Sequence, residues 1–314
     1  MCGRTACSLS KDCLRVACEY RDGSGNYRCP EWRDVSLEGT YEPSYNMPPQ
    51  SFCPVLVHNS QLGAETTSER IVTSMKWGLV PSWYQSDPAD FKVNTINCRI
   101  EGATSRKCYL PAITAGHRCV VIAEGYFEWQ KPSKQAFFVY CQQKPENSMA
   151  TRPWDCQEME DVLIYNGHWQ GPKLLTMAGL FDINKGHYSF TILTRSAPPY
   201  LRWLHDRAPV ILDNEDAVAS WLDPARDFNA LIRSLTVQSP TVLDWHQVPD
   251  LVGNVNNKGK QCVLPMQKPK PRPTLMDTWL TRSSRSGGEG PSTSHRSRSR
   301  SPVKGDEVPK SEVA

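Results

Sequence analysis

The sequence predicts an α+β fold with a mainly antiparallel, barrel-like β-sheet and a few peripheral helices. Short apolar stretches rich in β-branched and aromatic residues recur along the chain, and only a few stretches have helical spacing. A third observation is the change of composition near residue 265, after which Pro, Ser, Gly and Arg dominate. We therefore predict one folded domain over residues 1–264 and a disordered tail over residues 265–314.

The predicted elements follow one another without internal repeats. Ser10 is a candidate cap for a helix in residues 11–20, and helices are also predicted over residues 213–222 and 228–235. The polar stretch 142–173 is predicted to be a long loop or insertion. Strands are predicted over residues 54–58, 71–79, 119–123, 127–129, 136–141, 174–181, 188–194 and the VIL run at 210–212, with a hairpin joining 127–129 to 136–141.

Charge gives no reason to expect that the folded part binds nucleic acid. The tail carries ten Lys and Arg against five Asp and Glu, a net charge of +5 in a chain of +3, which leaves −2 for residues 1–264. Any nucleic-acid contact in the folded part must therefore rest on a local basic patch.

The cysteine pattern argues against disulfide and metal frameworks. The twelve cysteines form no Cys-x-x-Cys pair, and no group of Cys and His has the spacing of a zinc site. No secretory signal opens the chain, and no apolar run approaches a length of about 18 residues. We expect reduced thiols, no metal or other cofactor, no membrane contact, a monomer, and a nuclear or cytosolic location.

The second residue is the most informative position. Its small side chain favours removal of Met1, so we expect a mature chain that begins at Cys2. A terminal Cys carries an amine with a reference pKa of about 7.7–8.0 beside a thiol of about 8.5. Such a pair condenses with an aldehyde to an imine, which the thiol then closes to a five-membered thiazolidine. The alternative is that position 2 is an arbitrary start.

The block NTINCRIE at 94–101 places three polar side chains at alternate positions. In an extended strand, Asn97, Arg99 and Glu101 would share one face. An Asn can accept from an ammonium and hold a hydroxyl, and an Arg can clamp a phosphate with two hydrogen bonds. The alternative is a solvated strand face.

Two further positions carry candidate acid–base groups. Glu128 stands between two aromatic residues directly after a predicted buried strand, which suits general acid–base work; the alternative is an outward-facing Glu on an edge strand. His205 is followed by Asp206 and Arg207, and such an imidazole is poised near neutral pH. The alternative for His205 is a satisfied surface histidine.

Three tryptophans lie close to these groups in the sequence. Trp77, Trp83 and Trp129 offer aromatic surfaces on which unstacked bases could pack, each worth about 1–3 kcal/mol. The alternative for each is packing in the core, the commoner fate of Trp.

Seven blocks together resemble the SOS response-associated peptidase (SRAP) family. The resemblance covers about residues 1–264 and departs from the family pattern at Glu124, where the family has Asp, and at Cys98, where bacterial members commonly have Ala. In the family's order, the blocks are MCGR at the start, PSYNMPP at 43–49, MKWGLVPSW, NTINCRIE, AEGYFEW, LHDRAP and WHQVPDLVGNVNNKG at 245–259.

The resemblance implies a sensor of abasic sites in single-stranded DNA that forms a covalent thiazolidine crosslink through Cys2. It implies that Asn97 holds the crosslink, that Glu128 lies near the terminal amine, and that His205 assists opening of the sugar ring. It also implies lyase-type Schiff-base chemistry and shielding of the lesion during replication-coupled repair. The residues expected to contact DNA are Arg4, Trp83, Arg99, Trp129 and Arg207.

Two other functions stay open from the sequence. In the first, Cys2, Asn97 and Glu128 serve acyl transfer in a terminal-nucleophile peptidase that processes its own N-terminus. In the second, the protein reads 5-hydroxymethylcytosine without catalysis, holding a flipped base between its aromatic residues. Cleavage of another protein would favour the first, and binding without a denaturant-resistant complex would favour the second.

The tail contains one apolar island, from Leu275 to Leu280. It resembles the short motifs that dock on the replication sliding clamp but lacks their usual upstream Gln, and the alternative is a chance cluster. The Arg/Ser run suits a nuclear address, a phosphorylation target or a loose DNA contact. Tail lysines could accept ubiquitin, after which the proteasome would remove the adduct. We expect a location in the nucleus at replication forks.

Overall fold

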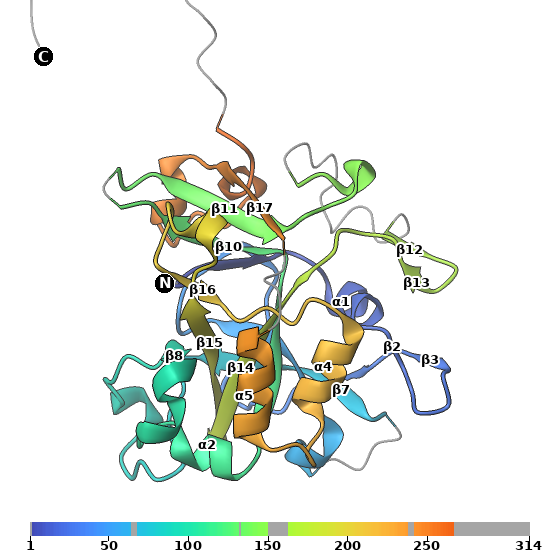
Figure 1. Ribbon diagram of the computed structural model, residues 1–314, viewed down its shortest axis with the longest axis vertical. Helices are drawn as coiled ribbons and strands as arrows, with labels where there is room; N and C mark the ends of the chain where they lie inside the picture. Colours follow the sequence, from blue (N-terminus) through green and yellow to red (C-terminus); the bar gives the residue numbers. More distant parts are fainter. Residues whose placement is uncertain (1, 64–67, 132, 150–162, 238–241, 267–314) are drawn as a thin grey trace, which may run out of the picture. The chain divides into compact units, whose positions relative to one another are not determined.

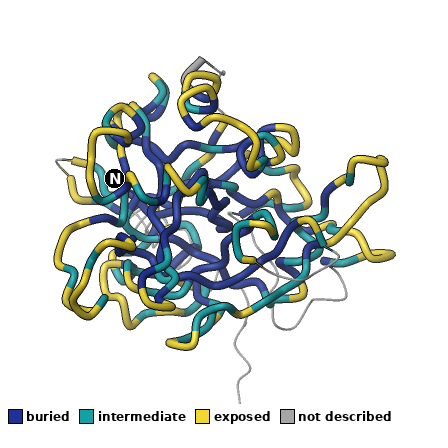
Figure 2. Tube along the Cα trace, turned by 90° about the horizontal axis from the view of Figure 1, so that it is seen from below, coloured by how far each residue is buried: buried dark blue, intermediate teal, exposed yellow. Residues whose placement is uncertain are grey.

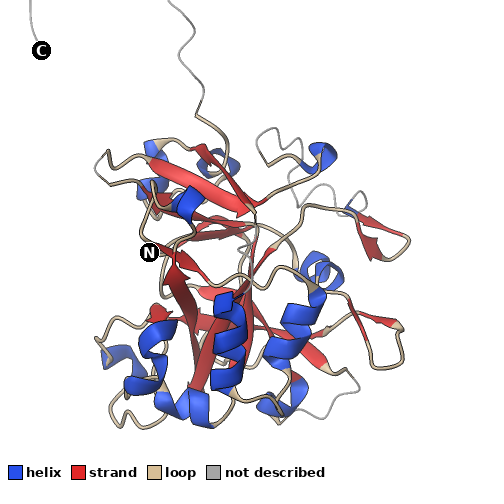
Figure 3. Ribbon diagram, in the orientation of Figure 1, coloured by secondary structure: helices blue, strands red, loops and turns tan. Residues whose placement is uncertain are grey.

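The structure is a computed structural model, and strands form most of its regular secondary structure (Figures 1 and 3). Few helices accompany the sheets, so the predicted α+β class is confirmed. The predicted tail disorder and the island from Leu275 to Leu280 lie outside the described part of the chain. The structure describes residues 2–63, 68–131, 133–149, 163–237 and 242–266.

The larger sheet closes on itself. Its strands are β4 (Glu31–Trp32), β6 (Phe52–His58), β7 (Arg70–Trp77), β8 (Asn97–Arg99), β9 (Arg118–Ala123), β14 (Leu175–Asn184), β15 (His187–Ser196) and β16 (Arg207–Pro209). The order β16-β15-β14-β9-β6-β7-β4 places β15 and β7 far apart, yet these two strands also pair in parallel. Strands β15, β14, β9, β6 and β7 therefore form a ring, which confirms the barrel-like prediction.

The smaller sheet is antiparallel, and its strand β11 is buried on both faces. It comprises, in order, β17 (Leu243–Gln247), β11 (Ala136–Cys141), β10 (Gly125–Trp129), β1 (Thr5–Cys7) and β5 (Ser44–Met47). Phe137 and Val139 of β11 join the main core, whereas Phe138 and Tyr140 join a second apolar cluster on the opposite face. Buried residues of both clusters are dark blue in Figure 2. Two small hairpins complete the strands: β2 (Tyr20–Arg21) with β3 (Tyr27–Arg28), and β12 (Ile164–Tyr165) with β13 (His168–Trp169).

The helices lie outside the sheets (Figure 3). They are α1 (Lys11–Ala17), α2 (Leu110–Thr114), α4 (Glu215–Leu222) and α5 (Phe228–Val237). As predicted, the Ser10 hydroxyl caps α1 by accepting from Cys13 N at 3.1 Å. Helix α4 packs on β9, where the Trp221 indole donates to the Cys119 carbonyl at 2.9 Å. Within the described ranges, no helix has the length and apolar character to cross a membrane.

The predicted strand at the VIL run is wrong in its extent, because only Ile211 of the run forms a β-bridge. Strand β16 ends at Pro209, whose ring nitrogen has no hydrogen to donate to a sheet ladder. Beyond it, Val210 N donates to the Leu193 carbonyl and Leu212 N to the Thr176 carbonyl, both at 2.8–2.9 Å. The run therefore crosses from β15 to β14, where Ile211 forms an isolated antiparallel bridge with Met177.

The predicted loop at 142–173 is more ordered than expected. It contains the short hairpin of β12 and β13, whose register pairs Ile164 with Trp169. Residues 150–162 of this stretch lie outside the described part of the chain. The polar composition hid the hairpin because each of its strands is only two residues long.

Candidate active site

Cys2 is buried beside β10. Its side chain has no exposed surface. Phe127 N donates to the Arg4 carbonyl at 2.8 Å, which extends the pairing of β1 with β10 toward Cys2 and the Glu128 end of β10. Burial raises the pKa of the Cys2 thiol, and the negative charge of Glu128 raises it further. The thiol is therefore protonated at neutral pH.

Asn97 binds Cys2 directly, although 95 positions separate them in the chain. Its Nδ2 donates to the Cys2 backbone carbonyl at 2.7 Å. Two aromatic side chains fix the backbone around Asn97: the Tyr109 hydroxyl donates to the Asn97 carbonyl at 3.1 Å, and the Trp77 indole donates to the Ile96 carbonyl at 2.9 Å. These bonds fix the start of β8, so the Asn97 side chain is held in position against the Cys2 backbone.

Glu128 faces the interior and does not lie on an edge strand. Strand β10 is central, between β1 and β11, and Glu128 is 5% exposed. Because side chains alternate along a strand, Glu128 shares its face with Tyr126, which belongs to the main core. Its charge acts on both the Cys2 thiol and the His205 ring, which places the three groups in one cluster.

His205 lies in the turn between the 3₁₀ helix η5 (Pro199–Leu201) and β16, with 10% of its side chain exposed. Its Nδ1 lies 2.9 Å from the amide N of Arg207 and 2.7 Å from Oδ1 of Asp206. These contacts suit two protonation states: the neutral ring accepts from Arg207 N and keeps its proton on Nε2, whereas the charged ring donates to Asp206. Burial lowers the pKa of His205, although Glu128 opposes the shift. The neutral form therefore prevails at pH 7.

The predicted shared face of Asn97, Arg99 and Glu101 is wrong at its last member. Strand β8 ends at Arg99, and Glu101 lies in the 3₁₀ helix η3 (Ile100–Ser105). Its carboxylate accepts two hydrogen bonds from Arg207, at 2.7 and 2.9 Å, and these bonds hold the pKa of Glu101 below its usual range. Arg207 is 9% exposed and already has a carboxylate partner, whereas Arg99 is exposed.

Arg4 connects the start of the chain to its last described segment. Its guanidinium lies over the half-buried Trp129 ring at 5.7 Å, and its Nη1 donates to Asn46 Oδ1 at 2.8 Å and to the Val252 carbonyl at 2.9 Å. The sequence analysis did not single out Asn46. The available signal was that Asn46 lies in the block PSYNMPP and its acceptor Val252 in the block WHQVPDLVGNVNNKG, both of which resemble the family. The carbonyls that accept from its Nδ2 are those of Val252, Asn254 and Asn257, at 3.1, 3.1 and 2.8 Å.

The two departures from the family pattern lie at buried positions. Glu124 has no exposed surface, and its Oε2 accepts from the backbone N and the hydroxyl of Ser8, at 2.7 and 2.8 Å. It thereby fixes the chain directly after β1. Cys98 is 1% exposed and packs in the main core next to Asn97. Both departures therefore concern packing near the site.

The three tryptophans differ in exposure. Trp77 has no exposed surface and stacks on Phe190 with ring centroids 6.3 Å apart, so the prediction that it offers a surface to bases is wrong. Trp129 is half-buried. Trp83 is 48% exposed, and its indole donates to the Lys107 carbonyl at 3.1 Å. Of the three, Trp83 presents the largest free ring surface.

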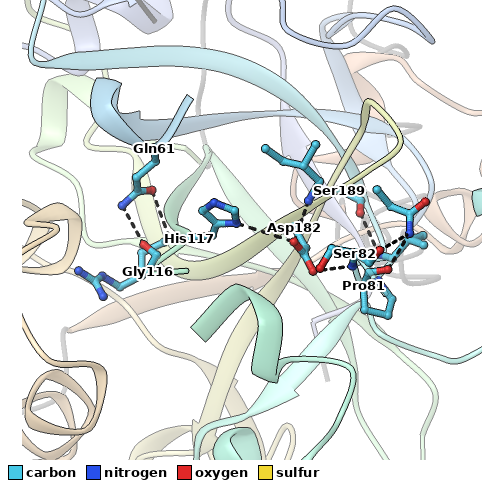
Figure 4. A network of polar contacts seen from close by, with 11 residues as sticks. Gln61, Pro81, Ser82, Gly116, His117, Asp182 and Ser189 are labelled. Carbon is cyan, nitrogen blue, oxygen red and sulfur yellow. Dashed lines mark hydrogen bonds and ion pairs between the residues drawn. The ribbon is translucent and has the colours of Figure 1, made fainter. Parts of the chain in front are cut away.

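The Trp83 loop, residues 80–86, is held by side chains of β14. The Asp182 carboxylate accepts from Ser82 N at 2.7 Å, and Figure 4 shows it directed at that backbone. Asn184 has 1% exposure and donates to three loop carbonyls. The loop therefore has a defined conformation without strand pairing. The acceptors of Asn184 Nδ2 are the carbonyls of Pro81, Ser82 and Tyr84, at 2.8, 3.3 and 2.8 Å.

Comparisons with known proteins bear on the family and the fold of the chain. The family model for SOS response associated peptidase (SRAP) matches residues 1–255. The abasic site processing protein HMCES of Xenopus tropicalis is 39% identical over 84% of this chain and 78% of its own, and that of Gallus gallus is 38% identical over 87% and 80%. A crystal structure of a protein from Bacteroides thetaiotaomicron has a TM-score of 0.58 at 18% identity, covering 84% of this chain and 100% of its own, which shows a shared fold.

Proposed function

Because the chain belongs to the SOS response associated peptidase (SRAP) family, we propose that it processes abasic sites in single-stranded DNA by forming a covalent thiazolidine through Cys2. The names of its vertebrate relatives support the substrate. The observation that carries the proposal is the 2.7 Å hydrogen bond from Asn97 to the Cys2 carbonyl beside Glu128. The chemistry requires Cys2 to be the first residue of the mature chain.

The raised pKa of the Cys2 thiol sets the order of the steps, because a protonated thiol is a poor nucleophile. The neutral amine attacks the aldehyde carbon of the opened sugar, and the resulting carbinolamine loses water to give an imine. The sulfur then bonds to the imine carbon while the thiol proton passes to the nitrogen. Aldehyde and aminothiol thus yield a thiazolidine and one water, with no oxidant and no cofactor.

Three side chains assist these steps. His205 in its charged form, with Nδ1 donating to Asp206, gives its Nε2 proton to the ring oxygen as the sugar opens and becomes the neutral ring. Glu128, shielded from solvent in β10, takes a proton from the Cys2 ammonium and delivers one to the departing hydroxyl. Asn97 holds the Cys2 backbone so that amine and thiol face the same carbon. Before the thiol closes the ring, the imine permits β-elimination, and protonation of the thiazolidine by Glu128 permits reversal.

The proposed DNA contacts differ in how much surface they offer. Trp83 and Arg99 are exposed and suit a base and a phosphate. Arg4, Trp129 and Arg207 remain predicted contacts. The internal hydrogen bonds of Arg4 and Arg207 leave less of each guanidinium for a phosphate, so we expect them to shape the site as well as contact DNA.

The peptidase alternative fits this site less well. Cysteine peptidases attack with a thiolate whose pKa a neighbouring cation lowers. At Cys2 the thiol pKa is raised by burial and by the carboxylate of Glu128. This environment favours attack by an amine over attack by a thiolate. The reader of 5-hydroxymethylcytosine remains an outcome of the experiment below.

A single-stranded oligonucleotide with one abasic site tests the proposal. Mature protein should shift it on a denaturing gel, and prior borohydride reduction of the aldehyde should abolish the shift. Cys2→Ala should form no adduct while its non-covalent binding survives. Cys53→Ala is the matched control, since Cys53 is another buried thiol, 2% exposed, with no terminal amine on its own residue. A stable adduct with Cys2→Ala, or full activity in molecules that retain Met1, would refute the assignment.

The predictions about the tail, residues 265–314, are proposals about partners and location. We propose that residues 275–280 dock on the replication sliding clamp, that the Arg/Ser run directs the chain to the nucleus, and that ubiquitin marks the adduct for the proteasome. Deletion of residues 267–314 should then leave crosslinking in solution unchanged while reducing recruitment to replication forks. Unchanged recruitment would remove the tail from the mechanism.

A further inference from the structure

An aromatic cluster lies next to His205 and has no part in the chemistry above. Trp203 precedes His205 by two residues and is 39% exposed. Its ring meets Phe137 edge-on with centroids 4.9 Å apart, and it is tilted against Trp245 at 5.6 Å. Strands β11 and β17 therefore support one side of the indole, while the rest of the ring faces solvent.

The turn that presents Trp203 also presents His205. The backbone N of Leu204 and that of His205 both donate to the Leu201 carbonyl, at 3.0 and 3.3 Å. The Gln130 amide donates to the Trp203 carbonyl at 3.5 Å, which ties the turn to the β10–β11 hairpin. Figure 1 shows the segment between β15 and β16 beside that hairpin. Two residues of chain span at most about 7 Å, so the indole lies within reach of a nucleotide adjacent to an abasic sugar at His205.

Two exposed cations accompany the indole. Lys131 follows Glu128 on the β10–β11 hairpin, and its positive charge contributes to the lowered pKa of His205, after burial. Arg202 directly precedes Trp203 and is exposed, and its Nε donates to the Ala197 carbonyl at 3.2 Å, so its Nη groups are the ones proposed to meet a phosphate. Exposed aromatic rings between cations are the pattern of single-strand binding, in which bases stack and phosphates meet Lys or Arg.

The nearby carboxylates cancel only part of this charge at the indole. Asp206 is 77% exposed and lies 2.7 Å from Nδ1 of His205, so one carboxylate stands against the two cations. Asp244 lies one residue from Trp245, but side chains alternate along β17, and Asp244 acts with burial to raise the pKa of Tyr140 to about 12 on the opposite face. The face of Trp203 thus favours a polyanion with flat rings over an acidic peptide, which lacks such rings.

We propose that Trp203, supported by Trp245 and Phe137, is a stacking platform for the base of a nucleotide that flanks the abasic site, with Lys131 and Arg202 contacting the adjacent phosphates. This proposal rests on the proposed function, because it places the abasic sugar at His205. It adds a binding subsite on one flank of the lesion.

Binding measurements with an uncrosslinkable strand test the platform. The probe is a fluorescent single strand that carries one tetrahydrofuran abasic analogue, in three forms: both flanks present, the 5′ flank removed, and the 3′ flank removed. Trp203→Ala should weaken binding of the complete strand about fivefold to tenfold, as expected for loss of one stacked base. With one of the truncated strands the variant and the wild type should bind equally, because the stacked base is absent.

Control variants separate stacking from damage to the fold. Trp203→Phe should stay within about twofold of wild type because it keeps an aromatic face, and Trp203→Leu should lose affinity like Trp203→Ala. Tyr165→Ala removes a ring that is 66% exposed on β12 and should change nothing. Lys131→Ala should reduce the slope of log affinity against log salt by about 0.7.

The failures of the two proposals are distinguishable. Equal losses for Trp203→Ala with all three strands, or wild-type affinity in a folded Trp203→Ala protein, would overturn the platform. Absence of DNA binding by the wild type would instead overturn the proposed function. Thermal unfolding of each variant shows that the comparison concerns folded protein.

Discussion

Glu128 lies on a central strand and Cys2 precedes the strand that pairs with it, whereas Trp83 lies on a loop without regular structure. In the first region, the hydrogen bonds between β1 and β10 and the bond from Asn97 to the Cys2 carbonyl fix both groups, and neither is more than 5% exposed. In the Trp83 loop, side chains of a neighbouring strand replace that ladder: Asn184 donates to loop carbonyls and Asp182 accepts a loop amide. Both regions are ordered, but by different kinds of hydrogen bond.

The difference separates two tasks. Strand pairing buries reactive groups and excludes water, which strengthens electrostatic effects and suits proton transfer. A loop held by side chains leaves a large aromatic surface open, which suits a base. Changes in the first region should therefore alter the crosslinking rate with little effect on DNA affinity. Changes in the second should alter affinity with little effect on the rate at saturating DNA.

Among variants that keep Cys2, the largest effect should come from His205→Gln, which removes the proposed proton donor. We expect a loss of about 10²-fold or more in the single-turnover crosslinking rate, with DNA affinity unchanged. The advantage of wild type over the variant should grow as pH falls through the pKa of His205, which burial lowers below its usual value, because the charged ring is the stronger acid. Rates measured from pH 5 to 8 check this. If the ratio of the wild-type rate to the variant rate falls at low pH, His205 acts instead as a base in its neutral form.

Asn97→Ala should come next, with a loss of about 10- to 100-fold in the crosslinking rate, because the Cys2 backbone loses its orienting bond. Tyr109→Phe is the matched control. It removes only the hydroxyl that donates to the Asn97 carbonyl, so its loss should be smaller. Gel-based rates at saturating DNA, together with anisotropy for binding, measure both variants. A loss of DNA affinity as large as the loss of rate would contradict the view that the Cys2 region governs the rate and the Trp83 loop governs affinity.

Local sequence patterns predicted the buried strands but not the way the barrel closes. Strands β9, β14 and β15 are covered on both faces and so read as apolar runs, which made them recognisable. Closure depends on the parallel pairing of Phe190 with Trp77, far apart in the chain. No local period encodes such a pair. The contact of Asn97 with Cys2 was likewise expected only from the resemblance to a family.

Errors arose where a distant partner decided the local conformation. Alternate spacing suggested that Glu101 shares a face with Asn97, but the strand ends at Arg99 and Arg207, 106 positions away, supplies the partner of Glu101. The role of Asn184 has the same origin, since its acceptors lie about 100 positions earlier. Side-chain clamps of this kind leave no periodic signal in the sequence.

Asn184→Ala should show that the Trp83 loop depends on its clamp. Three loop carbonyls would lose their donor, so we expect a loss of about 1–3 kcal/mol in the free energy of unfolding, with DNA affinity severalfold weaker. In the Trp83→Ala background the same change should cost no further affinity. Urea unfolding and anisotropy measure the two effects. Lys185→Ala, which removes an exposed contact to the same loop, should have little effect. If the affinity losses of Asn184→Ala and Trp83→Ala add in the double variant, the Asn184 hydrogen bonds do not act through Trp83.

The smallest effect should come from Glu101→Gln, at the border between the two regions. Arg207 is 9% exposed but Glu101 is 52% exposed, so solvent screens the pair and limits its contribution to about 1 kcal/mol or less. Hydrogen bonds from Arg207 hold the pKa of folded Glu101 below its unfolded value of about 4.3.

The contribution of Glu101 is thus present above the unfolded pKa and disappears as pH falls through the folded pKa. Urea unfolding from pH 3 to 7 should show the free energies of unfolding of wild type and Glu101→Gln converging at the acidic end. At each pH the two proteins should have the same crosslinking rate. A constant gap between the two proteins at every pH would mean that packing of Glu101, and not its charge, holds Arg207 in place. A fall in the crosslinking rate would instead show that the Arg207–Glu101 ion pair supports the reactive groups and does not serve DNA binding alone.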